Sequence, residues 1–138
     1  MILSLDANTA IELLRGQRPR VRQRMTDAEL RGDKLVMSAI VLYELAFGAM
    51  ASPRTDHHVA ELERFLNEVE VEPWLPEDAV AAAKIATDLE RRGQRIGVLD
   101  TLIAGQALNR GWTVVTANTR EFARVDGLAV EDWSAPQP

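Results

Sequence analysis

The chain begins with Ile2-Leu3-Ser4-Leu5-Asp6-Ala7-Asn8-Thr9, and these residues indicate the class of its fold. Residues 2–5 are apolar and compatible with a short β-strand. The strand ends at Asp6, after which Asn8 and Thr9 can cap a helix that runs through Leu14. The stretch therefore predicts a strand that passes directly into a helix.

The same alternation of strands and helices continues along the chain. Further strands are predicted over residues 35–37, 69–71, 113–116 and 128–130, and further helices over 21–30, 38–50, from Ser52-Pro53 onward, 76–92 and 100–109. This order predicts a parallel sheet with helices on both faces. No repeat or linker interrupts it, so we expect one domain over residues 1–138. Ligands bind at the carboxyl ends of such strands, which here carry Asp6, Ser38 and the residues after Thr116.

Composition narrows the class of protein further. The 138 residues are 46% hydrophobic, enough for one core, and contain no cysteine, which excludes disulfides and thiolate sites. No apolar run is long enough to span a bilayer and no signal peptide opens the chain, so we expect a cytoplasmic protein without membrane contact. The net charge of −5 argues against coating nucleic acid by bulk electrostatics.

Basic residues must therefore act locally, and they form two clusters. The first comprises Arg15, Arg18, Arg20, Arg22 and Arg24, and the second comprises Arg91, Arg92 and Arg95. Each cluster could bind phosphate, and each could equally be a solvated surface.

Three acids lie within or beside apolar segments: Asp6, Glu44 and Asp100. A half-buried carboxylate is costly unless it is paired, hydrogen-bonded or bound to a metal, and no Lys or Arg is adjacent to any of the three. Asp6 and Asp100 precede helices and could simply cap them. Glu44 lies in mid-helix, where the alternative is an exposed stripe beside Tyr43. A shared cation would stabilise all three.

Carboxylate oxygens without cysteine favour Mg²⁺ or Mn²⁺ over Zn²⁺. Ions held in this way can activate a water molecule and stabilise the leaving oxygen of a phosphodiester. The three acids therefore indicate metal-assisted phosphodiester hydrolysis. His57 and His58 are adjacent on a predicted helix and should point in different directions, which favours a surface position over metal ligation.

In these acids and in the segments around them, the chain resembles the PIN domain over its whole length, and in particular the VapC toxins of toxin–antitoxin pairs. Four segments in this order, and the end of the chain, carry the resemblance: residues 5–9 (LDANT), 38–48 (SAIVLYELAFG), 97–105 (GVLDTLIAG), 114–122 (VVTANTREF) and the ending 130–133 (VEDW). Each motif alone is weak, but their order and spacing over nearly the full length are specific.

The resemblance implies a three-layer α/β/α fold with a central parallel sheet and an acidic pocket for Mg²⁺ or Mn²⁺. It implies endonucleolytic cleavage of RNA, in relatives associated with tRNA and rRNA, and inhibition by a cognate VapB-like antitoxin. A homodimer follows by analogy. The resemblance assigns Asp6, Glu44 and Asp100 as metal ligands and principal catalytic acids.

The sequence departs from the family pattern at Asn118, where many PIN domains carry a fourth acid. A second metal is therefore expected to bind weakly. Asn118, Thr116 and Glu121 would instead orient waters or an acid. Asn8 and Ser38 are further candidates near the pocket, and for both the alternative is helix capping.

Two other classes remain open from the sequence. Asp6 after a first strand also resembles the start of the haloacid-dehalogenase phosphatases, in which an aspartate is the nucleophile, but that family requires a second aspartate where Asn8 stands. The chain could also be a PIN-like binding module without activity, although its three intact acids argue against this.

Overall fold

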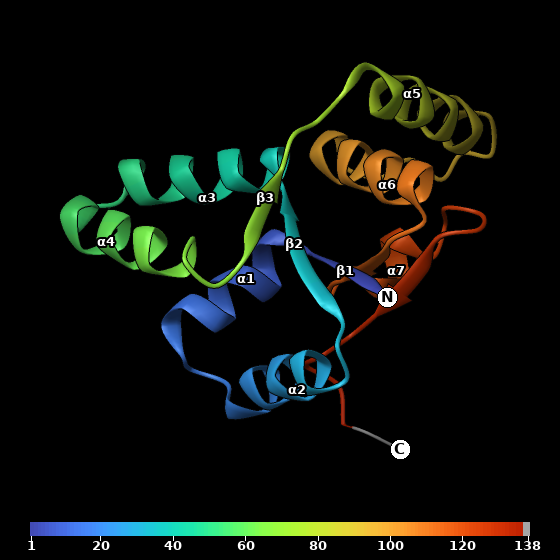
Figure 1. Ribbon diagram of the computed structural model, residues 1–138. Coiled ribbons are helices and arrows are strands. Elements are labelled where there is room, and N and C mark those ends of the chain that lie inside the picture. The colour runs from blue at the N-terminus through green and yellow to red at the C-terminus, as the bar shows by residue number, and fades with distance from the viewer. Residues whose placement is uncertain (137–138) are drawn as a thin grey trace.

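A five-stranded parallel sheet forms the centre of the computed structural model, which describes residues 1–136 (Figure 1). Its strands are β1 (Ile2–Leu5), β2 (Lys34–Ser38), β3 (Glu70–Glu72), β4 (Thr113–Val115) and β5 (Ala129–Glu131). The helices are α1 (Ala7–Arg15), α2 (Pro19–Leu30), α3 (Ala39–Ala51), α4 (Thr55–Phe65), α5 (Pro76–Arg91), α6 (Val98–Arg110) and α7 (Thr119–Phe122). The predicted α/β fold with a central parallel sheet is confirmed.

The short helix α7 was not predicted, and of the three residues named as possible caps of α1 only Asp6 has that role. Asp6, and neither Asn8 nor Thr9, caps α1, because its carboxylate accepts the first free N–H of the helix. Asn8 is exposed. The buried hydroxyl of Thr9 donates instead to the carbonyl oxygen of Val115 at 3.2 Å, which ties α1 to β4.

The order of the strands places a switch point between β1 and β4. The sheet reads β3-β2-β1-β4-β5, so the chain first builds outward from β1 to β3 and then crosses to β4 on the other side of β1. Parallel crossovers are right-handed, so the connections before and after this crossing pack on opposite faces of the sheet, as Figure 1 shows. Ligands of open α/β sheets bind where the strand order reverses. Here that point lies beyond the carboxyl ends of β1 and β4.

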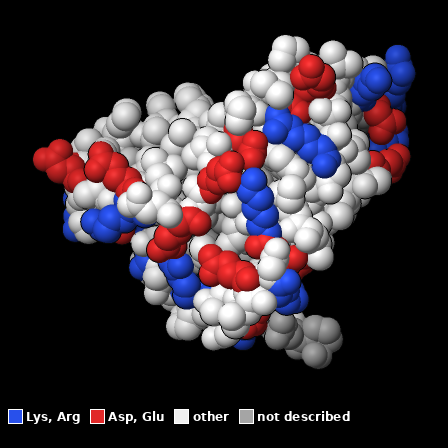
Figure 2. All heavy atoms as spheres, viewed as in Figure 1, with Lys and Arg blue, Asp and Glu red and all other residues white. Residues whose placement is uncertain are grey.

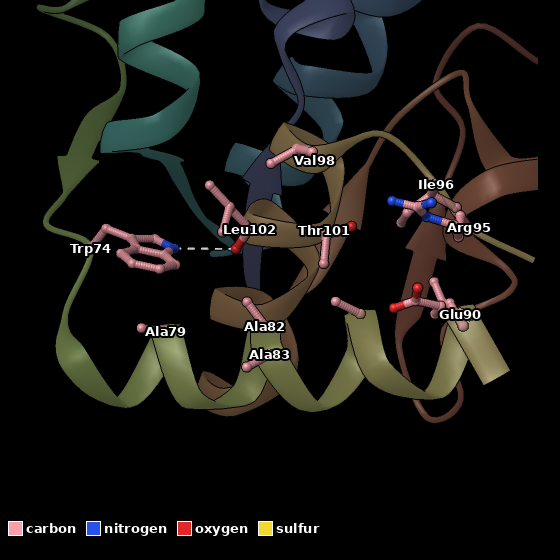
Figure 3. Close-up of a pocket in the computed structure, with 12 residues that line it drawn as sticks. Trp74, Ala79, Ala82, Ala83, Glu90, Arg95, Ile96, Val98, Thr101 and Leu102 are labelled. Atoms are coloured by element: carbon pink, nitrogen blue, oxygen red, sulfur yellow. Dashed lines mark hydrogen bonds between the residues drawn. The ribbon is translucent and has the colours of Figure 1, made fainter.

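Helices α5 and α6 pack closely because small residues face each other. A Cβ on Gly105 of α6 would lie 2.6 Å from the Cα of Ala82 on α5, closer than any side chain allows. Beside this contact lies an apolar groove of about 370 Å³, at whose edge the Trp74 indole N–H donates to the carbonyl oxygen of Leu102 at 3.2 Å (Figure 3). None of the three predicted acids lines this groove.

Acidic and basic side chains are interspersed on the face shown in Figure 2, and no large area of one sign forms there. This distribution agrees with the expectation that basic residues act locally. Within residues 1–136, no helix has both the length and the apolar character needed to cross a membrane.

Candidate active site

Asp6 lies at the switch point, at the carboxyl end of β1. Its backbone N–H donates to the Val115 carbonyl oxygen at 2.9 Å. Its two carboxylate oxygens accept from the N–H of Ala7 and the hydroxyl of Thr116, each at 2.7 Å. The residue is 4% exposed, and burial raises its pKa while these two hydrogen bonds oppose the rise. Asp6 is therefore a helix cap and a buried carboxylate at once.

Glu44 lies in the middle of α3 and is the most perturbed acid of the site. Burial chiefly, and then the negative charges of Asp6 and Asp100, raise its pKa to about 7. Its Oε1 atom is buried and has no hydrogen-bond partner within residues 1–136. A buried carboxylate oxygen without a partner is costly, and a bound cation would remove that cost.

Asp100 lies in the first turn of α6, after the N-cap residue Gly97. The alternative that Asp100 itself caps the helix is therefore wrong, although its charge does face the positive end of the helix dipole. Burial chiefly, and then the charge of Asp6 and the nearby carboxyl group of Glu121, raise its pKa to about 6. A hydrogen bond from Asn118 acts in the opposite direction.

Asn118 joins the site through its amide group. Its Nδ2 atom donates to Asp100 Oδ2 at 3.4 Å and to Glu121 Oε2 at 3.0 Å. Its backbone N–H donates to the Thr116 hydroxyl at 2.9 Å, which in turn donates to Asp6. Glu121, on α7, thus adds a fourth carboxylate next to Asp100. Sequence reasoning named Glu121 only as an orienting group, because its place depends on the unpredicted helix α7.

The four residues named from the sequence influence one another: the charges of Asp6 and Asp100 raise the pKa of Glu44, and Asn118 donates a hydrogen bond to Asp100. No Lys or Arg of residues 1–136 forms an ion pair with any of the three acids. Ser38 is buried at the end of β2, where its hydroxyl accepts the Ile40 N–H at 3.1 Å and caps α3. The capping role foreseen as the alternative for Ser38 is the one observed.

The donor set suits a divalent cation with a preference for oxygen. Its acidic members repel one another when ionised, as their raised pKa values show. A cation would offset that repulsion, and the free Oε1 of Glu44 offers it a ligand. These features define a class of protein, the three-layer α/β/α domains with an acidic pocket at the switch point of a parallel sheet.

Comparison with known proteins identifies the family within that class. The family model of the PIN domain matches residues 3–128. The tRNA(fMet)-specific endonuclease VapC of Shigella flexneri is 37% identical over 130 residues, which cover 94% of this chain and 96% of that protein. The chain belongs to the PIN domain family and, within it, to the VapC proteins.

Solved structures agree with this placement. VapBC2 from Rickettsia felis, bound to a DNA fragment from its promoter, matches with a TM-score of 0.91 at 28% identity, covering 96% of this chain and 99% of that one. DNA-bound VapBC from Salmonella typhimurium matches with a TM-score of 0.89 at 34% identity, covering 96% of this chain and 98% of that one.

Proposed function

We propose that this chain is a metal-dependent endoribonuclease, the toxin of a type II toxin–antitoxin pair, acting as one PIN domain over residues 1–138. The observation that carries the proposal is the pocket at the switch point, where within the described residues the acids have no basic partner and the Oε1 atom of Glu44 has no hydrogen bond. Membership of the VapC proteins supports RNA as the substrate.

In this proposal Asp6, Glu44 and Asp100 hold Mg²⁺, or Mn²⁺ in its place. The bound ion would supply the positive charge that activates water and stabilises the leaving oxygen of the phosphodiester. The Thr116 hydroxyl holds the carboxylate of Asp6, and the amide of Asn118 holds that of Asp100. These neighbours fix the direction of the carboxylates and so the place of the ion.

The substrate and partners follow from the relatives. The Shigella relative is named for tRNA(fMet), which makes structured tRNA the first substrate to test here. The solved relatives are VapBC structures, so we expect a VapB-like antitoxin as the inhibitor, and a homodimer of this chain within the complex.

The contacts that the arginines form favour the second basic cluster over the first for RNA binding. In the first cluster, ion pairs join Arg18 to Glu12, Arg22 to Glu68 and Arg24 to Glu131, at 3.3, 2.9 and 3.4 Å. Those charges are largely neutralised within the protein.

In the second cluster Arg92 pairs with Asp88 at 2.8 Å, but Arg91 and Arg95 form no ion pair within residues 1–136. Hydrogen bonds to backbone carbonyls bring a further arginine, Arg124, into place. Arg92 donates to the carbonyl oxygen of Arg124, and Arg124 donates to that of Arg95. A short loop joins Arg95 to the start of α6 and so to Asp100. Phosphate contacts made here would therefore lie near the acidic pocket.

The phosphatase alternative fits the site poorly. Asn8 is exposed and cannot serve as the second aspartate which that chemistry needs. Direct attack by water fits the geometry better than a phospho-aspartate intermediate.

The proposal is tested by incubating the purified chain with tRNA(fMet) and with other tRNAs in millimolar Mg²⁺ or Mn²⁺. We expect endonucleolytic cleavage that stops in EDTA and falls at least about 100-fold in Asp100→Asn, since removing a metal ligand removes the ion's contribution. The control is Glu63→Gln, at an exposed position of α4 outside the pocket, which should cleave normally. Unchanged cleavage in EDTA or in Asp100→Asn would contradict the proposal, and a folded wild type that cuts no RNA would favour the binding module.

A further inference from the structure

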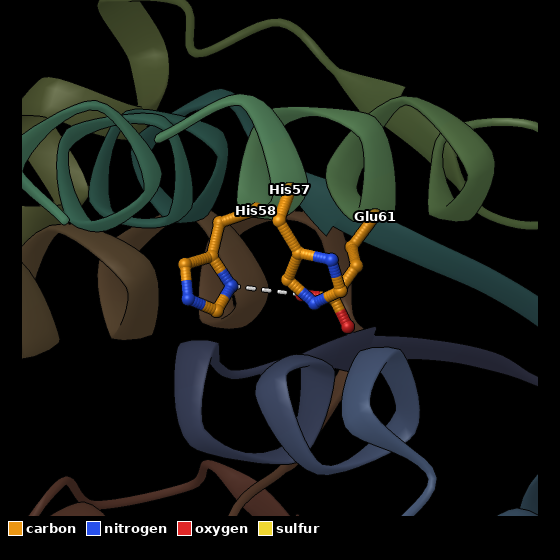
Figure 4. Close-up of side chains that lie close together, drawn as sticks. All are labelled: His57, His58 and Glu61. Carbon is orange, nitrogen blue, oxygen red and sulfur yellow. Dashed lines mark hydrogen bonds and ion pairs between the residues drawn. The ribbon is translucent and has the colours of Figure 1, made fainter. Parts of the chain in front are cut away.

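Three side chains of α4, those of His57, His58 and Glu61, converge at one point (Figure 4). Glu61 Oε1 lies 2.8 Å from His58 Nδ1 and 3.5 Å from His57 Nε2. The interpretation that the adjacent histidines point apart is wrong for a simple geometric reason. Successive residues of a helix are separated by about 100°, which places position 61 at about 40°, between 57 at 0° and 58 at 100°.

These three groups form a ligand set for a transition metal. One nitrogen of each imidazole ring and one carboxylate oxygen of Glu61 all lie within 4.8 Å of one another. In a tetrahedral zinc site the ligand atoms are about 3.3 Å apart, so the widest gap has to close by at most about 1.5 Å. The side chain of His57 is 47% exposed and that of His58 is 24% exposed, so both rings can rotate enough to close it.

The surroundings keep Glu61 ionised and leave one side of the cluster open. Although burial acts to raise the pKa of Glu61, the hydrogen bond from His58 and the charges of His57, His58 and Arg15 hold it below its ordinary value. His58 and Glu61 line a groove of about 130 Å³ between α1, α3 and α4, which Glu44 also lines. Three protein ligands beside a groove leave a coordination position free for water or another ligand.

We propose that His57, His58 and Glu61 form a second metal site, which takes Zn²⁺ or a similar borderline ion and faces the groove that Glu44 also lines. Its imidazole donors distinguish it from the all-oxygen pocket, because imidazole suits zinc whereas carboxylates suit magnesium. Arg15, also in the groove, is the cation that competes with the metal for Glu61.

The test is calorimetric titration of the full chain with Zn²⁺ alone as the probe, in buffer containing millimolar Mg²⁺ to occupy the acidic pocket. We expect one Zn²⁺ per chain, an affinity at least about tenfold weaker in His57→Ala and in Glu61→Gln, and a tighter one in Arg15→Gln. Glu63→Gln, on the same helix but outside the cluster, should bind Zn²⁺ as the wild type does.

A second measurement covers the case in which a variant is poorly folded. Co²⁺ added to the wild type in place of Zn²⁺ should show the visible absorption of a site with imidazole ligands, and Zn²⁺ should abolish it. Zn²⁺ binding that is unchanged in both ligand variants, or that is lost in Asp100→Asn instead, would overturn the proposal and leave the cluster a His58–Glu61 hydrogen bond beside His57. This outcome is independent of RNA cleavage, so it can fail while the proposed function stands.

Discussion

Replacing Glu44 by Gln should stabilise the metal-free protein at alkaline pH. The pKa of Glu44 rises from an ordinary value of 4.5 to about 7, chiefly by burial and then by the charges of Asp6 and Asp100. At about 1.4 kcal/mol per pKa unit the shift corresponds to about 3 kcal/mol, and solvent screening of this partly exposed group reduces it to about 2 kcal/mol. Gln keeps the shape of the side chain without the charge.

The sign of the pH dependence follows from the direction of the shift. The folded pKa lies above the unfolded one, so the carboxyl group favours folding fully below 4.5 and loses that contribution as pH rises through about 7. The Gln variant lacks this titration. Above pH 7 it should therefore unfold at a temperature about 4–8 °C higher than the wild type, and the difference should vanish near pH 4.5.

The measurement is thermal unfolding of both proteins in EDTA, at intervals from about pH 4.5 to about pH 8.5. Glu63→Gln, an exposed substitution of the same kind, should show no pH-dependent difference from the wild type. Millimolar Mg²⁺ should reverse the order, because it binds the folded wild type more tightly than the variant. A Gln variant that is no more stable than the wild type at alkaline pH without metal would refute the claim that ionised Glu44 destabilises the metal-free protein.

Three further predictions concern packing and the pocket. Asp78→Ala should cost about 3–5 kcal/mol in urea unfolding, because Asp78 is fully buried and its loss removes the 2.8 Å ion pair with Arg110 and the hydrogen bonds from Leu75 and Asn109; the exposed ion-pair acid Asp88, changed to Ala, should cost under about 1 kcal/mol, and equal losses would contradict this. Gly105→Ala should cost about 1–3 kcal/mol, because its Cβ would lie 2.6 Å from α5; an unchanged melting temperature would contradict the close packing. Asn118→Asp should tighten Mn²⁺ binding in calorimetry and lower the metal-free melting temperature by about 2–4 °C; weaker Mn²⁺ binding would show that the amide is the better group there.

Much of the fold could be predicted because it rests on local patterns. Apolar runs bounded by Gly, Pro and capping residues predicted the long helices α3, α5 and α6 to within about two residues, as expected where periodicity is strong. The acids Asp6, Glu44 and Asp100 were noticed because charge in an apolar segment requires a partner. The family resemblance then supplied their shared role, which the sequence pattern alone left open.

What could not be predicted depends on contacts between distant segments. Asp78 lies in the first turn of the predicted helix, and it is buried and forms an ion pair at 2.8 Å with Arg110 of α6. No local pattern marks that pairing. The convergence of His57 and His58 is different, because the signal was present in the sequence. Glu61 lies between the two histidines in helical angle, and reading only the adjacent pair missed it.

Asn118 shows how the pocket balances metal binding against stability without metal. Its amide donates to both Asp100 and Glu121, and the first of these hydrogen bonds lowers the pKa of Asp100 against the other influences that raise it. An ionised aspartate at 118 could only accept hydrogen bonds, so it would add charge to the site and remove the donor that two carboxylates share. Because Glu121 already lies beside Asp100, the pocket has a fourth carboxylate without an acid at 118. The departure from the family pattern therefore removes a repulsion that only a bound cation could otherwise offset.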